Sequence, residues 1–330
     1  MNSHRSGHPI VVLAGGLSHE RDVSLRSGRR TAEALRSAGL DVAERDVDSG
    51  LLAALLADPP TCVVPMLHGE SGEDGAIREV LDLLGVPYVG SGPAACRTAF
   101  DKPVAKSVVA RVGITTPLGV CLPHETFREL GAAQVMDAVI ARLGLPIVVK
   151  PARSGSALGC TLVESAADLP DAMVNAFAYG SVALIETYVA GTEVSVPVVD
   201  DGSGPRALPA VAIKPDGPIY DYTARYTAGS TEFTVPAGLP ADVLAECARV
   251  AVAAHEALGL RDLSRSDLIV RDDGTVCFLE VNVAPGFTET SLVPLSVEAA
   301  GLDLGDVLAS LVRASLVRAA SARDARTTTP

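Results

Sequence analysis

Long apolar runs are absent from this chain of 330 residues. A helix that crosses a membrane needs about 20 mostly apolar residues in succession, and no such stretch occurs. Near the N-terminus the apolar run "PIVVLAGG" (9–16) is short, and we interpret it as a strand rather than a signal peptide. We therefore expect a cytoplasmic protein with no membrane partner.

Cysteine is scarce and scattered along the chain. The six cysteines stand singly, at Cys62, Cys96, Cys121, Cys160, Cys247 and Cys277. No two of them have the spacing of a zinc site, and the pattern is not that of a disulfide framework. We therefore expect each cysteine to be a small, buried apolar residue.

Positive charge is also in short supply. The chain has 27 basic and 40 acidic residues, which gives a net charge of −13. This balance argues against a nucleic-acid partner, because nucleic-acid-binding surfaces are basic. Only four of the basic residues are lysines, namely Lys102, Lys106, Lys150 and Lys214. Since the chain uses arginine as its general cation, each lysine is expected to be needed as a compact point charge.

The remaining composition is typical of a globular protein. Hydrophobic residues make up 48% and charged residues 20%, and the length suggests two or three domains. Over residues 9–95, strand-like apolar runs alternate with helical patterns, which predicts a parallel sheet with helices on its faces. We expect an N-terminal unit (1–95), a central unit (96–186) and a larger C-terminal unit (187–330).

The expected elements follow the apolar periodicity of the sequence. Strands are predicted at 9–16, 41–47, 61–67, 182–189, 193–199, 208–213, 263–270 and 275–282, with a strand, glycine-rich loop and strand in 145–163. Helices are predicted in 21–40, 68–86, 101–113, 166–178, 241–258, 294–300 and 304–319. The segment 215–238 is predicted to be a loop, and the polar tail 321–330 to be frayed.

The stretch "FLEVNVAPG" (278–286) combines a buried-looking strand with a carboxylate and an amide. Glu280 and Asn282 stand two residues apart, so their side chains share one face of the strand. A proline and a glycine then end the strand. Upstream, Arg265 and Asp267 have the same spacing in a second apolar strand.

If these two strands form a hairpin, Asp267 lies across from Glu280 and Asn282. Three oxygen ligands would then meet at one site, and hard oxygen ligands suit Mg²⁺. A carboxylate among apolar residues is costly without a partner, which favours this interpretation. The alternatives are buried polar groups that satisfy one another, or the solvent-facing side of a hairpin.

Two further stretches are compatible with a nucleotide. Lys150 ends an apolar strand just before "SGSALG" (154–159), and small residues let backbone N–H groups approach an anion. The spacing is not that of a Walker motif, and a plain hairpin turn explains this stretch equally well. Glu186 and Glu193 flank "TYVAG" and could bind adenine and ribose, although glutamate is common on any surface.

Taken together, the motifs carry more information than any one of them. They are "GGLSHERDVSLRSG" (15–28), "LHGESGEDG" (67–75), "DKPVAK" (101–106), "PIVVKPARSGSALG" (146–159), "ETYVAGTEVSV" (186–196), "IYDYTARYTAGSTEFTVPA" (219–237) and "SRSDLIVRDDGTVCFLEVNVAPGFTETSLVP" (264–294). In this order and spacing the chain resembles the D-alanine–D-alanine ligase family of the ATP-grasp superfamily. The resemblance implies a three-domain ATP-grasp architecture with an N-terminal parallel-sheet domain.

The resemblance also implies ATP and magnesium as cofactors, with ATP between the second and third domains. The ATP-binding residues that it implies are Lys102, Lys150, Glu186, Val189, Glu193 and Arg225. Two Mg²⁺ ions, for which Mn²⁺ could substitute, would be held by Asp267, Glu280 and Asn282. They would offset the repulsion between a substrate carboxylate and the γ-phosphate that it attacks.

In the implied reaction, an amino acid becomes an acyl phosphate and the amine of a second amino acid attacks it. Arg265 and the Gly286 backbone N–H would stabilise the resulting oxyanion. Glu20 would pair with the ammonium group of the first substrate. Ser156 and Tyr226 would complete a hydrogen-bonded group with Glu20.

Further substrate contacts are implied at His68, beside the first substrate, and at Ser291 and the Leu292 N–H, which would take the second carboxylate. Some of these residues have plainer explanations when taken singly. Glu20 could be a first-turn helix carboxylate, His68 a hydrogen-bonded loop histidine, and Tyr226 ordinary packing. Their joint occurrence favours the catalytic interpretation.

The chain departs from the usual family pattern in three places. The glycine-rich loop has Ser154-Gly155-Ser156-Ala157, where Glu-Gly-Ser-Ser is usual. Arg225 stands where the family usually has lysine, and Val283 where threonine is common.

The resemblance implies an enzyme that joins two D-alanines with ATP, for peptidoglycan. The alternatives are a dipeptide ligase of secondary metabolism that uses other amino acids, and a nucleotide-binding protein without activity. The complete set of metal and oxyanion residues argues against the inactive alternative. The resemblance also allows for a homodimer.

Overall fold

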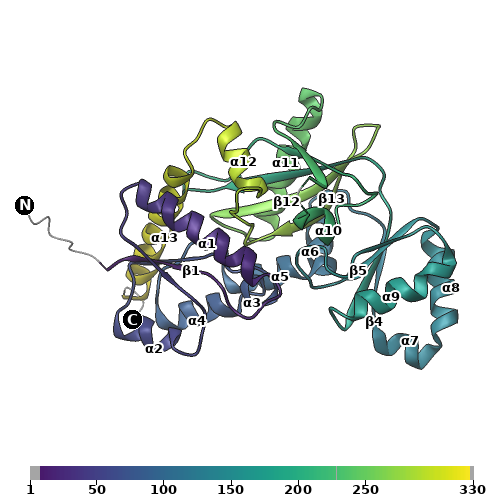
Figure 1. Cartoon of the computed structure of the whole chain (residues 1–330), viewed down its shortest axis with the longest axis horizontal. Helices are drawn as coiled ribbons and strands as arrows, with labels where there is room; N and C mark the ends of the chain where they lie inside the picture. The colour runs from purple at the N-terminus through teal and green to yellow at the C-terminus, as the bar shows by residue number, and fades with distance from the viewer. Residues whose placement is uncertain (1–7, 228, 328–330) are drawn as a thin grey trace, which may run out of the picture.

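The computed structural model describes residues 8–227 and 229–327, except for the side chains of Thr223, Tyr226 and residues 325–327. It contains three sheets with helices packed against them (Figure 1). Within these residues, none of the helices has the length and apolar character needed to cross a membrane. The predicted α/β fold class is confirmed.

The N-terminal sheet has the strand order β2-β1-β3 and is parallel throughout, as predicted. Its strands are β1 (Ile10–Leu13), β2 (Val42–Arg45) and β3 (Cys62–Pro65). The helices of this part are α1 (Arg21–Ser37), α2 (Leu51–Ala57), α3 (Glu70–Glu73) and α4 (Ala76–Leu84). Every residue of β1 and β3 is buried, as expected for parallel strands covered by helices on both faces.

The central sheet is antiparallel, with the order β4-β7-β5-β6. Its strands are β4 (Gly119–Pro123), β5 (Ile147–Pro151), β6 (Thr161–Val163) and β7 (Val182–Thr187). Its helices are α7 (His124–Leu130), α8 (Ala132–Leu143) and α9 (Leu169–Phe177), preceded by the short 3-10 turn η1 (Ala166–Asp168). The predicted strand–loop–strand of 145–163 is confirmed as β5 and β6.

The largest sheet lies in the C-terminal part and has the order β11-β10-β8-β12-β13, with β9 beside β8. Its strands are β8 (Thr192–Val199), β9 (Arg206–Ala207), β10 (Val211–Pro215), β11 (Thr231–Thr234), β12 (Leu263–Val270) and β13 (Val276–Asn282). Helix α11 (Ala241–Ala257) packs against it. All eight residues of β12 are buried, so its polar side chains need partners inside the protein.

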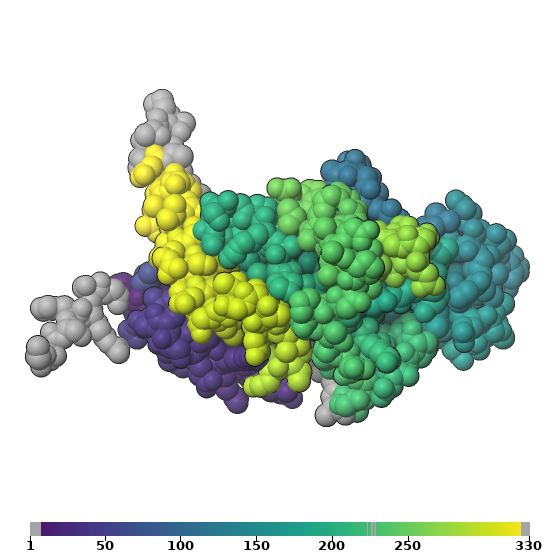
Figure 2. Space-filling model, turned by 90° about the horizontal axis from the view of Figure 1, so that it is seen from above, coloured from purple at the N-terminus to yellow at the C-terminus, as the bar shows by residue number. Residues whose placement is uncertain are grey.

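Helices cross between the three parts of the chain. Helices α5 (Pro93–Phe100) and α6 (Lys102–Ala110) contribute Cys96, Ala99, Ala105 and Val109 to the core of the C-terminal sheet. Conversely, α12 (Leu292–Ala299) and α13 (Leu304–Thr327) share a core with β1 and α1. In Figure 2 the yellow C-terminal segment accordingly lies against the purple N-terminal part. The unit boundaries near residues 95 and 186 therefore stay a prediction.

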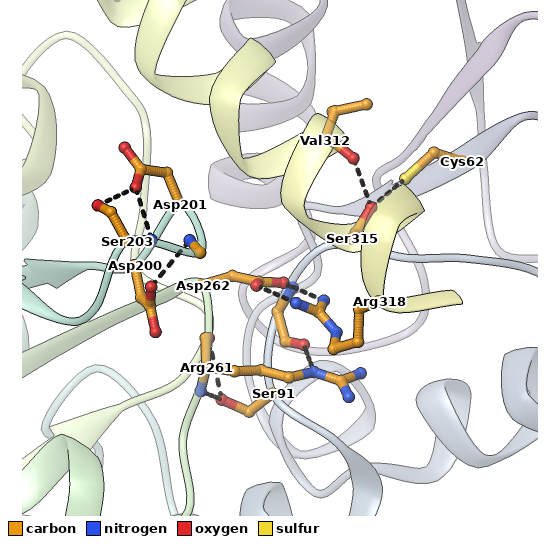
Figure 3. A network of polar contacts seen from close by, with 12 residues as sticks. Cys62, Ser91, Asp200, Asp201, Ser203, Arg261, Asp262, Val312, Ser315 and Arg318 are labelled. Carbon is orange, nitrogen blue, oxygen red and sulfur yellow. Dashed lines mark hydrogen bonds and ion pairs between the residues drawn. The ribbon is translucent and has the colours of Figure 1, made fainter. Parts of the chain in front are cut away.

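A cluster around the buried Asp262 joins α13 to the N-terminal part just before β12 (Figure 3). Asp262 accepts two hydrogen bonds of 2.7 Å from the guanidinium of Arg318 on α13, and a third of 2.7 Å from the Gly90 N–H. Asp262 has φ +64, a conformation that asparagine and aspartate tolerate better than most residues. The cluster fixes the start of β12, which carries Arg265 and Asp267.

Three sequence-based predictions differ from the structure. The segment 215–238, expected to be a loop, contains the short helix α10 (Tyr222–Tyr226) and the strand β11, which pairs with β10. Helix α13 continues to Thr327 instead of ending near 319, and the last part of the predicted frayed tail, 328–330, lies outside the described residues. Cys121 is exposed and Cys160 partly exposed, so their predicted burial is wrong.

Candidate active site

Two cavities contain the candidate site. The larger has a volume of about 450 Å³ and is lined by residues of the central sheet, the glycine-rich loop and the C-terminal sheet. The smaller, of about 100 Å³, is lined by residues of the N-terminal part, the glycine-rich loop and the segment after β13. Tyr220 and Arg225 line both cavities, so they stand where the two cavities meet.

Nearly all of the predicted site residues line these cavities. The larger cavity has Lys102, Lys150, Glu186, Val189, Glu193, Arg225, Asp267 and Glu280. The smaller cavity has Glu20, His68, Ser156, Arg225, Arg265, Asn282, Gly286, Ser291 and Leu292. The predicted contact of the Tyr226 side chain lies outside the described side chains.

Glu186 lies on β7 between two lysines. Lys150, on the neighbouring strand β5, places its Nζ 2.9 Å from Glu186 Oε2, and Lys106 hydrogen-bonds Glu186 Oε1. Burial by itself would raise the pKa of Glu186, but the two ammonium groups outweigh it and hold that pKa below its usual range. The glutamate is therefore ionised, and it presents hydrogen-bond acceptors to the larger cavity.

Lys102 opens α6, whose N-cap Asp101 accepts a hydrogen bond from the Val104 N–H. The Lys102 Nζ donates a hydrogen bond of 2.7 Å to the carbonyl oxygen of Ser154 and lies 3.5 Å from Glu280 Oε2. Lys102 therefore joins the glycine-rich loop to β13. Its buried charge faces the larger cavity, where an anionic ligand would be stabilised.

The predicted hairpin of Asp267 with Glu280 and Asn282 is confirmed. Strands β12 and β13 pair antiparallel, with Asp267 opposite Glu280 and Arg265 opposite Asn282. Arg265 donates two hydrogen bonds to Asp267, at 2.9 and 2.7 Å, and Ser195 donates a third to it at 2.7 Å. The buried carboxylate of Asp267 is thus held in one orientation.

The two remaining predicted metal ligands differ in their surroundings. Burial acts to raise the pKa of Glu280, but Lys102, Lys150 and other cations overcome it and lower that pKa to about 2. The Asn282 Oδ1 accepts a hydrogen bond of 2.8 Å from the Ala284 N–H. Carboxylate and amide oxygens are the ligands that Mg²⁺ prefers. Asp267, Glu280 and Asn282 therefore have the chemistry of a Mg²⁺ site.

At the smaller cavity, Ser156 donates a hydrogen bond to Glu20, although the two residues are 136 positions apart. Ser156 has φ +51, a strained conformation for serine. A Cβ at Gly155 would stand 2.5 Å from Glu20 Oε2. The glycine-rich loop therefore approaches the N-terminal part closely, and a larger residue at this position would displace the Glu20 carboxylate or the loop.

His68 supports the turn that carries Gly286. Its Nδ1 lies 2.9 Å from the Ala284 carbonyl oxygen and its Nε2 lies 3.0 Å from Ser27 Oγ. Because a carbonyl only accepts, Nδ1 carries the proton, and the Ser27 hydroxyl donates to Nε2 while it accepts from the Phe287 N–H. Burial lowers the pKa of His68 to about 4, so the ring is neutral.

The same turn leads into α12. Ser291 precedes this helix, and its Oγ accepts a hydrogen bond of 2.9 Å from the Thr288 N–H. A Cβ at Gly286 would stand 2.9 Å from Ser291 Oγ. Gly286, Ser291 and the Leu292 backbone therefore lie together at the smaller cavity, at the N-terminal end of α12.

Four site residues were missed by the sequence analysis. Glu73 is buried, and burial together with the charge of Glu20 raises its pKa to about 8. Ser195 holds Asp267, Lys106 holds Glu186, and Tyr220 lies under Arg225, whose guanidinium carbon is 4.4 Å from the ring centre. Lys106 had a signal in the scarcity of lysine, whereas the others have common residue types and no distinctive spacing.

Comparison with known proteins gives a consistent result. Residues 108–313 match the family model described as "D-ala D-ala ligase C-terminus". The chain is 39% identical to a D-alanine–D-alanine ligase of Anaeromyxobacter sp. (strain K), covering 95% of this chain and 99% of that protein. A D-alanine–D-alanine ligase of Pseudomonas fluorescens (strain Pf0-1) is also 39% identical, over 93% of this chain and 91% of that protein.

Solved structures show the same likeness. The crystal structure of a D-alanine–D-alanine ligase from Bacillus anthracis complexed with ATP matches with a TM-score of 0.78 and 27% identity, covering 96% of this chain and 99% of that one. Sequence and structure agree over nearly the whole length, and the chain belongs to the D-alanine–D-alanine ligase family of ATP-grasp enzymes.

Proposed function

We propose that this chain joins two molecules of D-alanine into D-Ala-D-Ala with ATP, through an acyl phosphate, to supply peptidoglycan synthesis. The observation that carries the proposal is the meeting of the two cavities at Tyr220 and Arg225. The larger cavity has lysines and carboxylates suited to a nucleotide, and the smaller has a size suited to small amino acids. Their meeting point is where a phosphoryl group would pass to a carboxylate.

ATP occupies the larger cavity in this proposal. Lys102 and Lys150 bind its phosphates, and Arg225 adds a third cation near the reacting phosphate. Glu186 and Glu193 take the adenine amino group and the ribose hydroxyls, with Val189 packed against the base. Burial raises the pKa of Glu193 to about 7, so this group can donate or accept a hydrogen bond near neutral pH.

Asp267, Glu280 and Asn282 are the residues that hold Mg²⁺, two ions in our proposal. The metal, when bound, offsets negative charge on the phosphates and on the attacking carboxylate. The protein's own contribution is orientation. Arg265 and Ser195 fix Asp267, and the cations around Glu280 keep it ionised.

The acyl transfer takes place at the smaller cavity. Glu20 pairs with the ammonium of the first D-alanine, whose carboxylate attacks the γ-phosphorus while ADP leaves. The amine of the second D-alanine then attacks the acyl carbon, and phosphate leaves when the tetrahedral intermediate collapses. Arg265 and the Gly286 N–H stabilise the oxyanion of that intermediate.

The second D-alanine is oriented by its carboxylate. Ser291 and the Leu292 N–H bind this group, beside the positive end of the α12 dipole. His68 holds the turn in front of them and borders the first substrate. Tyr226, on the segment 215–238, joins the Ser156–Glu20 pair and helps this segment to exclude water from the acyl phosphate, which would otherwise hydrolyse.

The test is a panel of D- and L-amino acids incubated with ATP and Mg²⁺, read by mass spectrometry. We expect D-alanine alone to give D-Ala-D-Ala, with one ADP and one phosphate per dipeptide. A product formed only from L-amino acids, or no product from any of them, would refute the proposal. We further propose that the protein is cytoplasmic and that its chain has three domains. We also propose that it forms a homodimer, which sedimentation at micromolar concentration would detect.

A further inference from the structure

Helix α6 places two lysines between the central and C-terminal sheets. Lys102 and Lys106 are four residues apart, so they share one face of the helix. Both are 7% exposed. Ala105 and Val109 anchor the helix in the core of the C-terminal sheet. From this anchored helix, Lys106 reaches across to Glu186 on the central sheet.

The Glu186 carboxylate is thereby held at both of its oxygens. Lys106 binds Oε1, and Lys150 lies 2.9 Å from Oε2. Among the described residues, Lys150 and Glu186 line the larger cavity and Lys106 does not. Lys106 therefore binds the Glu186 carboxylate from outside the cavity and does not contact a ligand bound there.

We propose that Lys106 is a positioning residue for nucleobase recognition. It fixes Glu186 as an ionised acceptor for the exocyclic amino group of adenine, and so sets a preference for adenine over purines that carry oxygen at C6. This inference rests on the proposed placement of ATP in the larger cavity.

The physical reason lies in what a carboxylate can accept. An ionised carboxylate is an acceptor only, so it pairs with the amino group of adenine and repels the oxygen of hypoxanthine. A protonated Glu186 could instead donate to that oxygen, and the preference would be lost. Because Glu186 is 2% exposed, burial favours its protonated form, and two nearby cations are needed to prevent this.

Lys106 is suited to this role by its shape and charge. A compact ammonium on a flexible stem can meet one carboxylate oxygen and leave the other to Lys150. Burial, and then the charge of Lys150, lowers the pKa of Lys106 to about 8, so the ammonium form predominates at neutral pH. The Lys106–Glu186 contact would also be present if Lys106 only held α6 against β7. The test must therefore measure the preference between purine bases, which a purely structural role would not change.

The experiment compares the affinities of ADP and IDP by calorimetry, which needs no turnover. Wild type should bind ADP about tenfold or more tightly than IDP, the range for one hydrogen bond to a charged group. Lys106→Met keeps the apolar stem and should reduce this ratio to about threefold or less. Ser107→Met places the same side chain on the exposed side of α6 and should keep the wild-type ratio.

One outcome would overturn the inference, namely a folded Lys106→Met protein with the full wild-type ratio of ADP to IDP affinity. If both affinities fell by the same factor, this ratio would be unchanged, and Lys106 would be a structural tie that shapes the cavity without affecting base preference.

If Lys106→Met does not fold, the same question can be asked with Glu186→Gln and with the double variant that carries both substitutions. The double variant removes one positive and one negative charge, so its net charge is that of the wild type. Glu186→Gln should remove the base preference, since an amide both donates and accepts. Adding Lys106→Met to it leaves no unpaired carboxylate and should change the ratio no further, whereas an additional change would refute the inference. A wild type that prefers ADP but makes no dipeptide would refute the proposed function alone.

Discussion

Replacing Gly155 with alanine tests the first-substrate site without removing any functional group. The added Cβ would stand 2.5 Å from Glu20 Oε2 and 3.2 Å from its carboxyl carbon, whereas ordinary contacts begin at 3.4 Å. The carboxylate, or the loop, must therefore move by about 0.9 Å, the difference between 3.4 and 2.5 Å. The φ of Gly155 is outside the left-handed region, so alanine adds no backbone strain there.

A shift of this size has a predictable cost. A misplacement of about 1 Å lowers catalysis by about 10²-fold, so kcat/KM for D-alanine should fall about 10- to 100-fold in Gly155→Ala. Affinity for ATP should stay within about twofold, because Glu20 lies at the other cavity. The assay varies D-alanine at saturating ATP with coupled detection of ADP, and calorimetry measures ATP binding.

Gly238→Ala is the matched control, since an added Cβ there meets nothing within 4 Å. A folded Gly155→Ala enzyme with wild-type kcat/KM for D-alanine would show that the Glu20 carboxylate does not bind this substrate.

Three other predictions concern the oxyanion, the metal and the response to acid. Arg265→Ala should lower kcat about 10²- to 10³-fold, and a rise in the KM for ATP alone would contradict this role. Glu280→Gln should abolish ligation while the urea midpoint is retained, so near-normal turnover at saturating Mg²⁺ would exclude Glu280 as a ligand. Burial lowers the pKa of His255 from its usual 6.5 to about 4, so the unfolded chain binds a proton that the folded protein excludes. Stability is then lost as pH falls from about 6.5 towards 4, by up to about 1.4 kcal/mol per pH unit. His255→Gln should flatten the pH dependence of urea unfolding by this amount, and an unchanged slope would contradict it.

The parts of the fold that the sequence predicted are those with strong local patterns. Strands β12 and β13 are joined by a short turn and pair with each other, so apolar alternation and polar spacing were enough to place Asp267 opposite Glu280. The buried strands of the parallel sheet were equally clear, because parallel strands are continuous apolar runs.

The missed elements have weak patterns for physical reasons. Strand β4 has no buried residue, α7 has none either, and α8 buries only Val139. Strand β4 nevertheless alternates exposed and half-buried residues, and α8 spaces Met136, Ile140 and Leu143 along one helical face. These two elements therefore had a regular but weakly buried pattern. Helices α5, α6, α12 and α13 pack against sheets from other parts of the chain. This is a tertiary arrangement, and the apolar periodicity of a single helix does not indicate which sheet the helix will cover.

The candidate site shows the same contrast between residues predicted from sequence motifs and residues that only the tertiary structure identifies. Motif order placed nearly all of the proposed residues at the two cavities, although Glu20 and Ser156 are far apart in sequence. Glu73 and Ser195 could not be found in this way, because Glu73 interacts with Glu20 through charge and Ser195 with Asp267 through a hydrogen bond. Such supporting residues are visible only when distances are known.

The structure also accounts for three departures from the family pattern, those at Ser154, Val283 and Arg225. Ser154 contributes its backbone carbonyl to Lys102, which any residue supplies. Val283 is 4% exposed within an apolar core, where a valine packs well. Arg225 differs, because its planar guanidinium lies 4.4 Å from the centre of the Tyr220 ring, an arrangement that favours arginine over lysine. The positive charge that faces both cavities is therefore held over the Tyr220 ring, where a planar guanidinium can stack and an ammonium group cannot.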